Sequence, residues 1–348
     1  MVMTPIVIDE LRPDEVLVEM KYSGLCHTVS GGLPHPELRA IPGHEGAGVV
    51  LPLGSAVRDK TLRVGDNVLL SFTACGDCHP CKEGRLTKCV VHPKINFRAT
   101  RLSDNTTSAK LADGRPVRSQ LLGQSSFARV SAVHQQSVVR WPDVEHLALY
   151  APLGCGFQTG TGTILNILKP KSYHSVVIFG MGSVGFTALM AAAYLGVKQI
   201  IAVDRVDSRL ALAQELGATD IINSSKISTS ISEEGGTNHA VDTTGAPGVI
   251  EQMLECLTLG GTAASIGVPP AGATIKLDVG SFLFGDGSLV GVLEGDSYPP
   301  EFIPRLIDLH RQGEFPIGKI CKVDPVDDLE LAIADMKAGV TIKPVLKF

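Results

Sequence analysis

The sequence lacks the features that would place a protein in a membrane or send it across one. No stretch approaches the roughly 18 consecutive apolar residues that cross a bilayer. The N-terminal segment MVMTPIVIDELRPDEV has neither the basic region nor the apolar core of a secretory signal. We therefore expect a cytoplasmic protein with no membrane partner. In that reducing compartment its eight cysteines are expected as metal ligands, catalytic thiols or buried small side chains rather than disulfides.

An excess of charge of one sign is also missing. The 31 basic and 36 acidic residues give a net charge of −5. Because there is no excess of basic residues, no nucleic-acid partner is expected. No internal repeat or low-complexity segment occurs. The length of 348 residues and the hydrophobic content of 44% indicate a globular protein of two domains. The 37 glycines indicate many tight turns.

The two parts of the chain differ in pattern. Residues 1–156 contain short Val- and Leu-rich runs separated by Gly and Pro, which predicts an antiparallel β domain. In residues 157–292, apolar strands such as SVVIF (175–179) alternate with amphipathic helices, which predicts a doubly wound parallel sheet of the α/β class. Residues 293–348 are too few for a core of their own and are expected to pack back onto the first domain.

A glycine-rich turn directly follows the strand SVVIF and opens a helix. In GMGSVG, Gly180 permits the tight turn, Gly182 allows close approach of a pyrophosphate, and Gly185 allows close helix–strand packing. The alternative is a purely structural turn. Asp204 ends the next strand, where a carboxylate binds the adenosine ribose and disfavours a 2′-phosphate, so NAD is expected rather than NADP. Arg209 is expected to stack on or bond to the adenosine end.

Four cysteines lie close together in CGDCHPCKEGRLTKC. Two CxxC steps and a fourth thiol within 15 residues can surround one tetrahedral ion. The rival interpretations are an iron–sulfur cluster, which the residues around the last cysteine do not favour, and a pair of disulfides. We expect a structural zinc ion held by Cys75, Cys78, Cys81 and Cys89.

A further cysteine lies in GLCHTVSGG, where Cys26 precedes His27 and Thr28. His44 and Cys155 are candidate partners, because a Cys–His–Cys set with one open position is a known form of catalytic zinc site. Spacing alone does not assemble three scattered residues, and each of them alone is equally compatible with buried structure.

Taken in order, the motifs GLCHT, PGHEGAGVV, the four-cysteine segment, APLGCGFQTG, VVIFGMGSVG and TIKPVLKF resemble the zinc-dependent medium-chain alcohol dehydrogenases over nearly the whole chain. GQSSFA (123–128) and EGDSYPPEFIPRLI (294–307) are most similar to the aryl-alcohol (benzyl-alcohol) branch. The resemblance implies a GroES-like catalytic domain formed by residues 1–156 and 293–348, and a Rossmann cofactor domain between them.

The resemblance also implies roles for individual residues. Cys26, His44 and Cys155 would ligate a catalytic zinc, the second zinc ion of the chain. Glu45 would approach the metal during ligand exchange, or else orient a ligand as a buried carboxylate. Thr28 would touch the substrate oxygen and pass its proton outward. Contacts to the nicotinamide or near the pyrophosphate would come from Thr244, Gly245, Val268, His27 and Lys343. Ser71, Phe72 and Leu293 could line the cleft, or they could be core and turn residues.

The chain departs from the family at several points. Members usually begin earlier, so an edge strand is expected to lack a partner, and the segment between Cys26 and His44 is shorter. Gly31 stands where some members carry a His of the proton relay. Val29 stands where members carry an Asp that accepts the ring N–H of the zinc-ligand His. Its loss is expected to weaken catalytic zinc binding, unless another acceptor replaces it.

The leading hypothesis is a zinc- and NAD-dependent dehydrogenase of an aromatic or bulky apolar primary alcohol and its aldehyde. The alternatives are a polyol or secondary-alcohol dehydrogenase on the same scaffold, and a catalytically weakened dinucleotide-binding paralogue that holds structural zinc only. The apolar strand GSLVGVLEG (287–295) is expected to pair across a symmetry axis, giving a homodimer or homotetramer.

Overall fold

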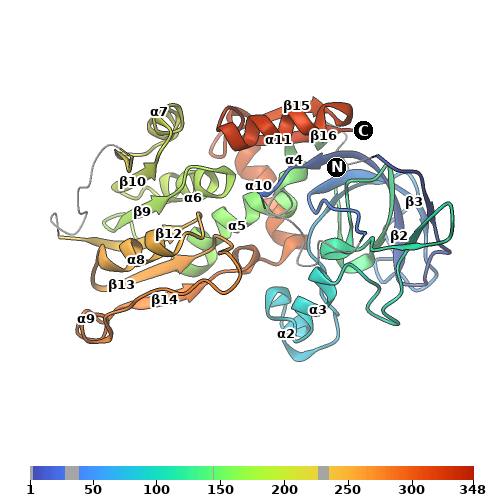
Figure 1. Ribbon diagram of the computed structural model, residues 1–348, viewed down its shortest axis with the longest axis horizontal. Helices are drawn as coiled ribbons and strands as arrows, with labels where there is room; N and C mark the ends of the chain where they lie inside the picture. Colours follow the sequence, from blue (N-terminus) through green and yellow to red (C-terminus); the bar gives the residue numbers. More distant parts are fainter. Residues whose placement is uncertain (1–2, 28–38, 144, 226–234) are drawn as a thin grey trace. The chain divides into compact units, whose positions relative to one another are not determined.

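The computed structural model describes residues 3–27, 39–143, 145–225 and 235–348. It has two compact units (Figure 1). The first comprises Met1–Gly156, Ser297–Asp308 and Ile317–Phe348, and the second Phe157–Asp296 and Leu309–Pro316. Among the described residues, no helix combines the length and the apolar character needed to cross a membrane.

The first unit is built on a seven-stranded, mainly antiparallel sheet, as its alternating pattern predicts. Val16, Val18 and Met20 of β2 point to one face and are at most 2% exposed, the period-two burial of a strand with one face on the core. The strand order is β15 (Cys321–Pro325), β16 (Lys343–Lys347), β2 (Glu15–Gly24), β3 (Gly46–Leu53), β4 (Asn67–Leu70) and β8 (Val138–Arg140), with β7 (Val130–His134) paired to β2.

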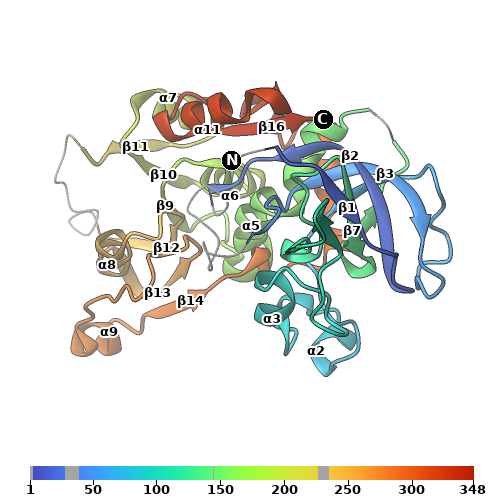
Figure 2. The ribbon, with the colours of Figure 1, turned by 45° about the vertical axis from the view of Figure 1, so that its right-hand side comes forward.

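The strand β2 is paired along both of its sides: β3 lies on one side, and two strands share the other. The last strand, β16, lies antiparallel to its C-terminal end, and β7 to its N-terminal part. Next to this sheet, Figure 2 shows β1 close to β7. β1 belongs to a separate three-stranded sheet of β1 (Ile6–Ile8), β5 (Ala109–Leu111) and β6 (Pro116–Val117).

The cysteine-rich segment forms a small lobe of short helices. Its core is apolar and includes Phe72, Leu86, Ile95 and Leu121. The helices of the lobe are α2 (His79–Lys82), η1 (Leu86–Lys88) and α3 (His92–Phe97), drawn in cyan in Figure 1. Further helices of the chain are α4 (Leu147–Tyr150), η4 (Ala151–Gly154), α5 (Gly156–Gly162), η5 (Thr163–Leu168), α10 (Pro299–Arg311) and α11 (Leu329–Ala338).

The second unit has the predicted parallel sheet, so the α/β prediction is confirmed. All five residues of β9 are buried, which explains why the strand is apolar after its first residue, Ser175. The order is β11 (Asp220–Asn223), β10 (Gln199–Asp204), β9 (Ser175–Phe179), β12 (Thr237–Asp242), β13 (Leu257–Ser265) and β14 (Ser288–Gly291). The helices between these strands are α6 (Ser183–Tyr194), α7 (Asp207–Glu215), α8 (Pro247–Glu255) and α9 (Val279–Phe284).

Candidate functional site

Three distant segments of the first unit meet at one point. Cys26 follows β2 and His44 precedes β3, and since Ser23 pairs with Gly46, the end of one strand lies beside the start of the other. Cys155 follows η4. The ligand atoms of Cys26, His44, Glu45 and Cys155 all lie within 4.8 Å of one another.

The chemistry of this group suits a divalent metal ion. A hydrogen bond from Cys155, together with nearby His44, holds the pKa of Cys26 well below its usual range against the effect of burial. The thiolate, not the thiol, is the form that binds metals. Two thiolates and an imidazole are the donors of a known type of zinc site that leaves one position open. The residues therefore fit the expected catalytic zinc.

A buried ion pair lies behind these ligands. Lys343 Nζ is 2.9 and 2.8 Å from the Oε1 and Oε2 atoms of Glu45, and the two side chains are 1% and 0% exposed. Gly156 N also donates to Glu45 Oε1, at 3.0 Å. Burial opposes the charge on the lysine, but Glu45 outweighs it and raises the pKa of Lys343. The sequence did not suggest this pair, and a contact of Lys343 with the pyrophosphate stays a prediction.

The remaining residues of GLCHTVSGG lie only in part within the described segments. His27 is exposed at the end of its segment. Thr28, Val29 and Gly31 lie outside the described residues.

The four cysteines of the lobe also converge, with all Sγ atoms within 4.8 Å of one another. Cys78 and Cys81 are 3.4 Å apart, and Cys75 and Cys81 are 3.9 Å apart. Tetrahedral zinc at Zn–S distances of about 2.3 Å places its sulfurs about 3.8 Å apart, so the spacing fits this ion. Backbone N–H groups of Val90 and Cys81 lower the pKa of Cys78 to about 6. None of the eight cysteines, all of which lie within the described residues, forms a disulfide.

The glycine turn of the second unit has the form that a dinucleotide needs. Gly180 has φ +93°, and a Cβ there would lie 2.5 Å from Thr243 Oγ1; a Cβ on Gly185 would lie 1.9 Å from Gly180 O. A Cβ on Gly182 would instead meet no atom within 4 Å, so the space beside this N-cap residue of α6 is open. The free N–H groups of a helix N-terminus are suited to binding an anion.

Asp204 at the end of β10 is held beside this turn. Its Oδ2 accepts a hydrogen bond from Met181 N at 2.6 Å, and its Oδ1 accepts from Arg205 N and Val206 N at 2.7 and 2.9 Å. On α7, the buried Nε of Arg209 has no protein hydrogen-bond partner among the described residues. Both side chains remain predicted adenosine contacts.

The loop after β12 is organised by a residue that the sequence analysis did not single out. Asp242 is fully buried and accepts hydrogen bonds from Thr244 N and Oγ1 (2.8 and 2.6 Å) and from Gly245 N (3.1 Å). A Cβ on Gly245 would lie 2.5 Å from Val268 O, whereas the Val268 side chain is 72% exposed. The sequence did carry a signal for Asp242: in AVDTTG, this carboxylate directly follows the apolar residues Ala240 and Val241.

The residues predicted to line a cleft are placed as follows. Ser71 and Phe72 are fully buried, and Ser71 Oγ donates to Gly154 O at 2.7 Å. Leu293 is 39% exposed.

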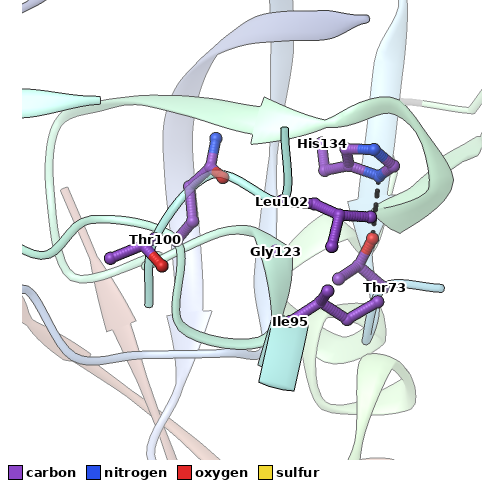
Figure 3. Close-up of a pocket in the computed structure, with 7 residues that line it drawn as sticks. Thr73, Ile95, Thr100, Leu102, Gly123 and His134 are labelled. Carbon is purple, nitrogen blue, oxygen red and sulfur yellow. Dashed lines mark hydrogen bonds between the residues drawn. The ribbon is translucent and has the colours of Figure 1, made fainter. Parts of the chain in front are cut away.

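A small cavity in the first unit lies beside the cysteine lobe (Figure 3). In it, Thr73 Oγ1 and His134 Nδ1 are 2.8 Å apart. The cavity has room for about one water molecule. None of the predicted site residues lines it, so we do not assign it to a substrate.

Two protein-family models match the chain. The model of the alcohol dehydrogenase GroES-like domain matches residues 12–143, and that of the zinc-binding dehydrogenases matches residues 183–311. The chain is similar to a geraniol dehydrogenase of Castellaniella defragrans, at 36% identity over 99% of this chain and 93% of that protein. Alcohol dehydrogenase 1 of Pisum sativum is 30% identical over 99% of this chain and 94% of the plant protein.

Two solved structures share the fold closely. An alcohol dehydrogenase zinc-binding domain protein from Burkholderia ambifaria is 40% identical, with a TM-score of 0.92. A benzyl alcohol dehydrogenase from Acinetobacter calcoaceticus is 36% identical, with a TM-score of 0.91. Each match covers 99% of this chain and 94% of the other.

Proposed function

We propose, from the premise that this chain belongs to the zinc-binding medium-chain alcohol dehydrogenase family, that it transfers a hydride between a primary alcohol or its aldehyde and NAD(H). The observation that carries the proposal is the convergence of Cys26, His44 and Cys155, with Glu45, within 4.8 Å. Family membership supports an oxidoreductase acting on small-molecule alcohols.

Each component has a part in this reaction. Zinc bound there would act as a Lewis acid that lowers the pKa of an alcohol oxygen, while NAD would accept the hydride. The chain's own residues hold and orient these groups. Cys26 binds as the thiolate, and Glu45 is fixed beside the ligands by Lys343 and Gly156. The Thr28 hydroxyl would pass the proton of the alcohol outward.

The cofactor proposal depends on the second unit. Gly182 would leave room for the pyrophosphate, and Asp204 would bind the ribose diol, which favours NAD over NADP. Arg209, Thr244, Gly245 and Val268 of this unit would complete the contacts, and His27 and Lys343 are further predicted contacts. In the lobe, the four thiolates would hold a second zinc with a structural role.

We further propose an aromatic or bulky apolar alcohol as substrate, because similar proteins are named for geraniol and benzyl alcohol. The rates of NAD reduction with benzyl alcohol, geraniol and sorbitol, repeated with NADP, test these proposals. We expect the two apolar alcohols and NAD to be preferred. Preference for sorbitol would support the polyol alternative, and no turnover of any alcohol by zinc-loaded protein would contradict the enzymatic proposal.

We also propose a cytoplasmic homo-oligomer. β14 is the edge strand of the second unit's sheet, and the neighbouring helix α9 exposes Val279, Leu283 and Phe284 by 70%, 71% and 84%. An open strand edge beside exposed apolar side chains is suited to pairing with a second copy. The molar mass in solution tests this, and a monomer at micromolar concentration would contradict it.

A further inference from the structure

Gln124 lies in the GQSSFA segment and is fully buried. Its Oε1 accepts a hydrogen bond from Gly46 N at 2.9 Å. Its Nε2 donates to His44 O at 2.9 Å and to Ser71 O at 3.0 Å. One side-chain amide therefore binds both peptide groups that flank Glu45, the first of which joins Glu45 to His44, and ties them to Ser71, the residue that follows β4.

The rest of the segment holds the preceding residues in another way. Ser126 N and Phe127 N donate to the carbonyls of Gly43 and Pro42, each at 3.0 Å. These bonds come from the backbone, and the bond to Gly43 O holds the peptide on the N-terminal side of His44. Within this segment, the peptide on the C-terminal side of His44 is bound by the side chain of Gln124, so this contact depends on the identity of residue 124.

The bonded chain continues to a second ligand. Ser71, whose carbonyl is bound by Gln124, donates its own hydroxyl to Gly154 O at 2.7 Å. Gly154 directly precedes Cys155, and a Cβ on Gly154 would lie 1.9 Å from Leu70 O, so the two backbones are in close contact. Gln124 and Ser71 together connect the peptide of His44 to the peptide before Cys155.

We propose that Gln124, acting with Ser71, is a positioning residue of the catalytic metal centre that sets how His44 and Cys155 face each other. The inference rests on the proposed zinc site at Cys26, His44 and Cys155. Metal sites tolerate ligand displacements of only about 0.2 Å, so groups that orient the ligands influence metal affinity strongly. Both residues reach the ligands through backbone carbonyls, and both side chains are fully buried.

The chemistry of the site requires an amide. Gln124 supplies one acceptor and two donors, and all three are used. A carboxylate would place an anionic oxygen against the carbonyl oxygens of His44 and Ser71, and an apolar side chain would leave Gly46 N–H buried without a partner. Glutamine at residue 124 is therefore not interchangeable with glutamate or methionine.

The test compares Q124A and S71A with the matched variant Q120A. Gln120 is also a buried glutamine, but its Nε2 donates to Glu15 Oε1 and Ala132 O, away from the ligands. For each variant we would measure the unfolding free energy, the zinc dissociation constant of the Cys26 site by chelator competition, and the absorption spectrum after exchange with Co²⁺. The spectrum reports ligand geometry directly, independently of turnover.

We expect Q124A and S71A to shift the Co²⁺ bands and to raise the zinc dissociation constant about 10–100-fold. Q120A should lose stability with neither change. Zinc affinity and spectra of Q124A equal to those of Q120A would overturn the proposal. If Q124A does not fold, S71A, which removes a single hydroxyl, decides it: a native Co²⁺ spectrum in S71A would overturn the proposal. Native protein that binds zinc only in the lobe would instead contradict the proposed function itself.

Discussion

Lys343 and Glu45 form an ion pair in the interior of the first unit, with Nζ 2.8 Å from Oε2 and 2.9 Å from Oε1. Glu45 directly follows the candidate ligand His44, and Lys343 begins the last strand, β16. Because β16 pairs with β2, whose end leads to Cys26, the final strand supplies a counter-charge to a carboxylate beside the metal ligands. The C-terminal strand thus contributes to the site as well as to the sheet.

Removing this counter-charge should be costly. In K343M, Glu45 would remain buried without its cation, and we expect the unfolding free energy to fall by roughly 3–5 kcal/mol. K343R keeps the charge and should lose less. K347M, which changes an exposed lysine of the same strand, is the control for denaturant unfolding. Equal stability of K343M and K347M would show that the pair contributes nothing.

The cofactor preference should depend on the charge of Asp204. D204N removes the negative charge and keeps one side-chain oxygen, which can accept from Arg205 N and Val206 N, while the bond from Met181 N to the second carboxylate oxygen is lost. We expect the ratio of kcat/KM for NADP to that for NAD to rise roughly tenfold, because the repulsion of a 2′-phosphate is lost. D220N removes an exposed charge at the start of β11 and should leave the ratio unchanged. If both variants behave alike, Asp204 does not set the preference.

A histidine pair at the start of β9 and β12 should make the second unit sensitive to acid. His174 Nδ1 accepts from Lys171 N at 3.3 Å, so the proton of the 2.9 Å contact with His239 belongs to His239 Nε2. Burial, with a contribution from His174, lowers the pKa of His239 from 6.5 to about 4. The unfolded chain therefore takes up a proton below pH 6.5 that the folded chain accepts only near pH 4.

Stability should consequently fall as the pH drops from 6.5 toward 4, by roughly 3 kcal/mol at pH 4 from this group, and should be unaffected above pH 7. H239Q retains a donor toward His174 but does not titrate. Unfolding free energies measured from pH 8 to pH 4 should decline less steeply in H239Q than in the native protein. Parallel curves would show that His239 does not contribute.

Val29 tests the departure from the family pattern. Replacing it with Asp would restore the carboxylate that accepts the ring N–H of the zinc-ligand His. We expect V29D to bind catalytic zinc about 10–100-fold more tightly, with a corresponding rise in turnover at limiting zinc. If zinc content and turnover are both unchanged, residue 29 does not limit the site.

The sequence predicted the fold because burial leaves a periodic record. In the strand SVVIF, the residues after Ser175 are all apolar because both faces of the strand are covered. Val16, Val18 and Met20 alternate with more exposed residues because one face of β2 is covered. The resemblance, carried by motifs in order, predicted the family, and the comparisons confirm it.

The supporting contacts of the site were not predictable in the same way. Gln124 binds the carbonyl of His44 across 80 positions, and Lys343 binds Glu45 across 298. Such contacts depend on which segments the sheet brings together, and a single buried Gln or Lys has no periodicity that would reveal its partner. Asp242 was closer to detection, because this carboxylate directly follows two apolar residues, Ala240 and Val241, at the end of β12.

Zinc content per chain tests the central claim most directly. Protein purified without chelator should hold two zinc ions, C155S should hold one, and C78S should also lose one, with a lower melting temperature. Two ions in the native protein, one of them dependent on Cys155, is the result we predict. A single ion that C155S retains and C78S loses would contradict the catalytic centre and support a dinucleotide-binding protein with structural zinc only.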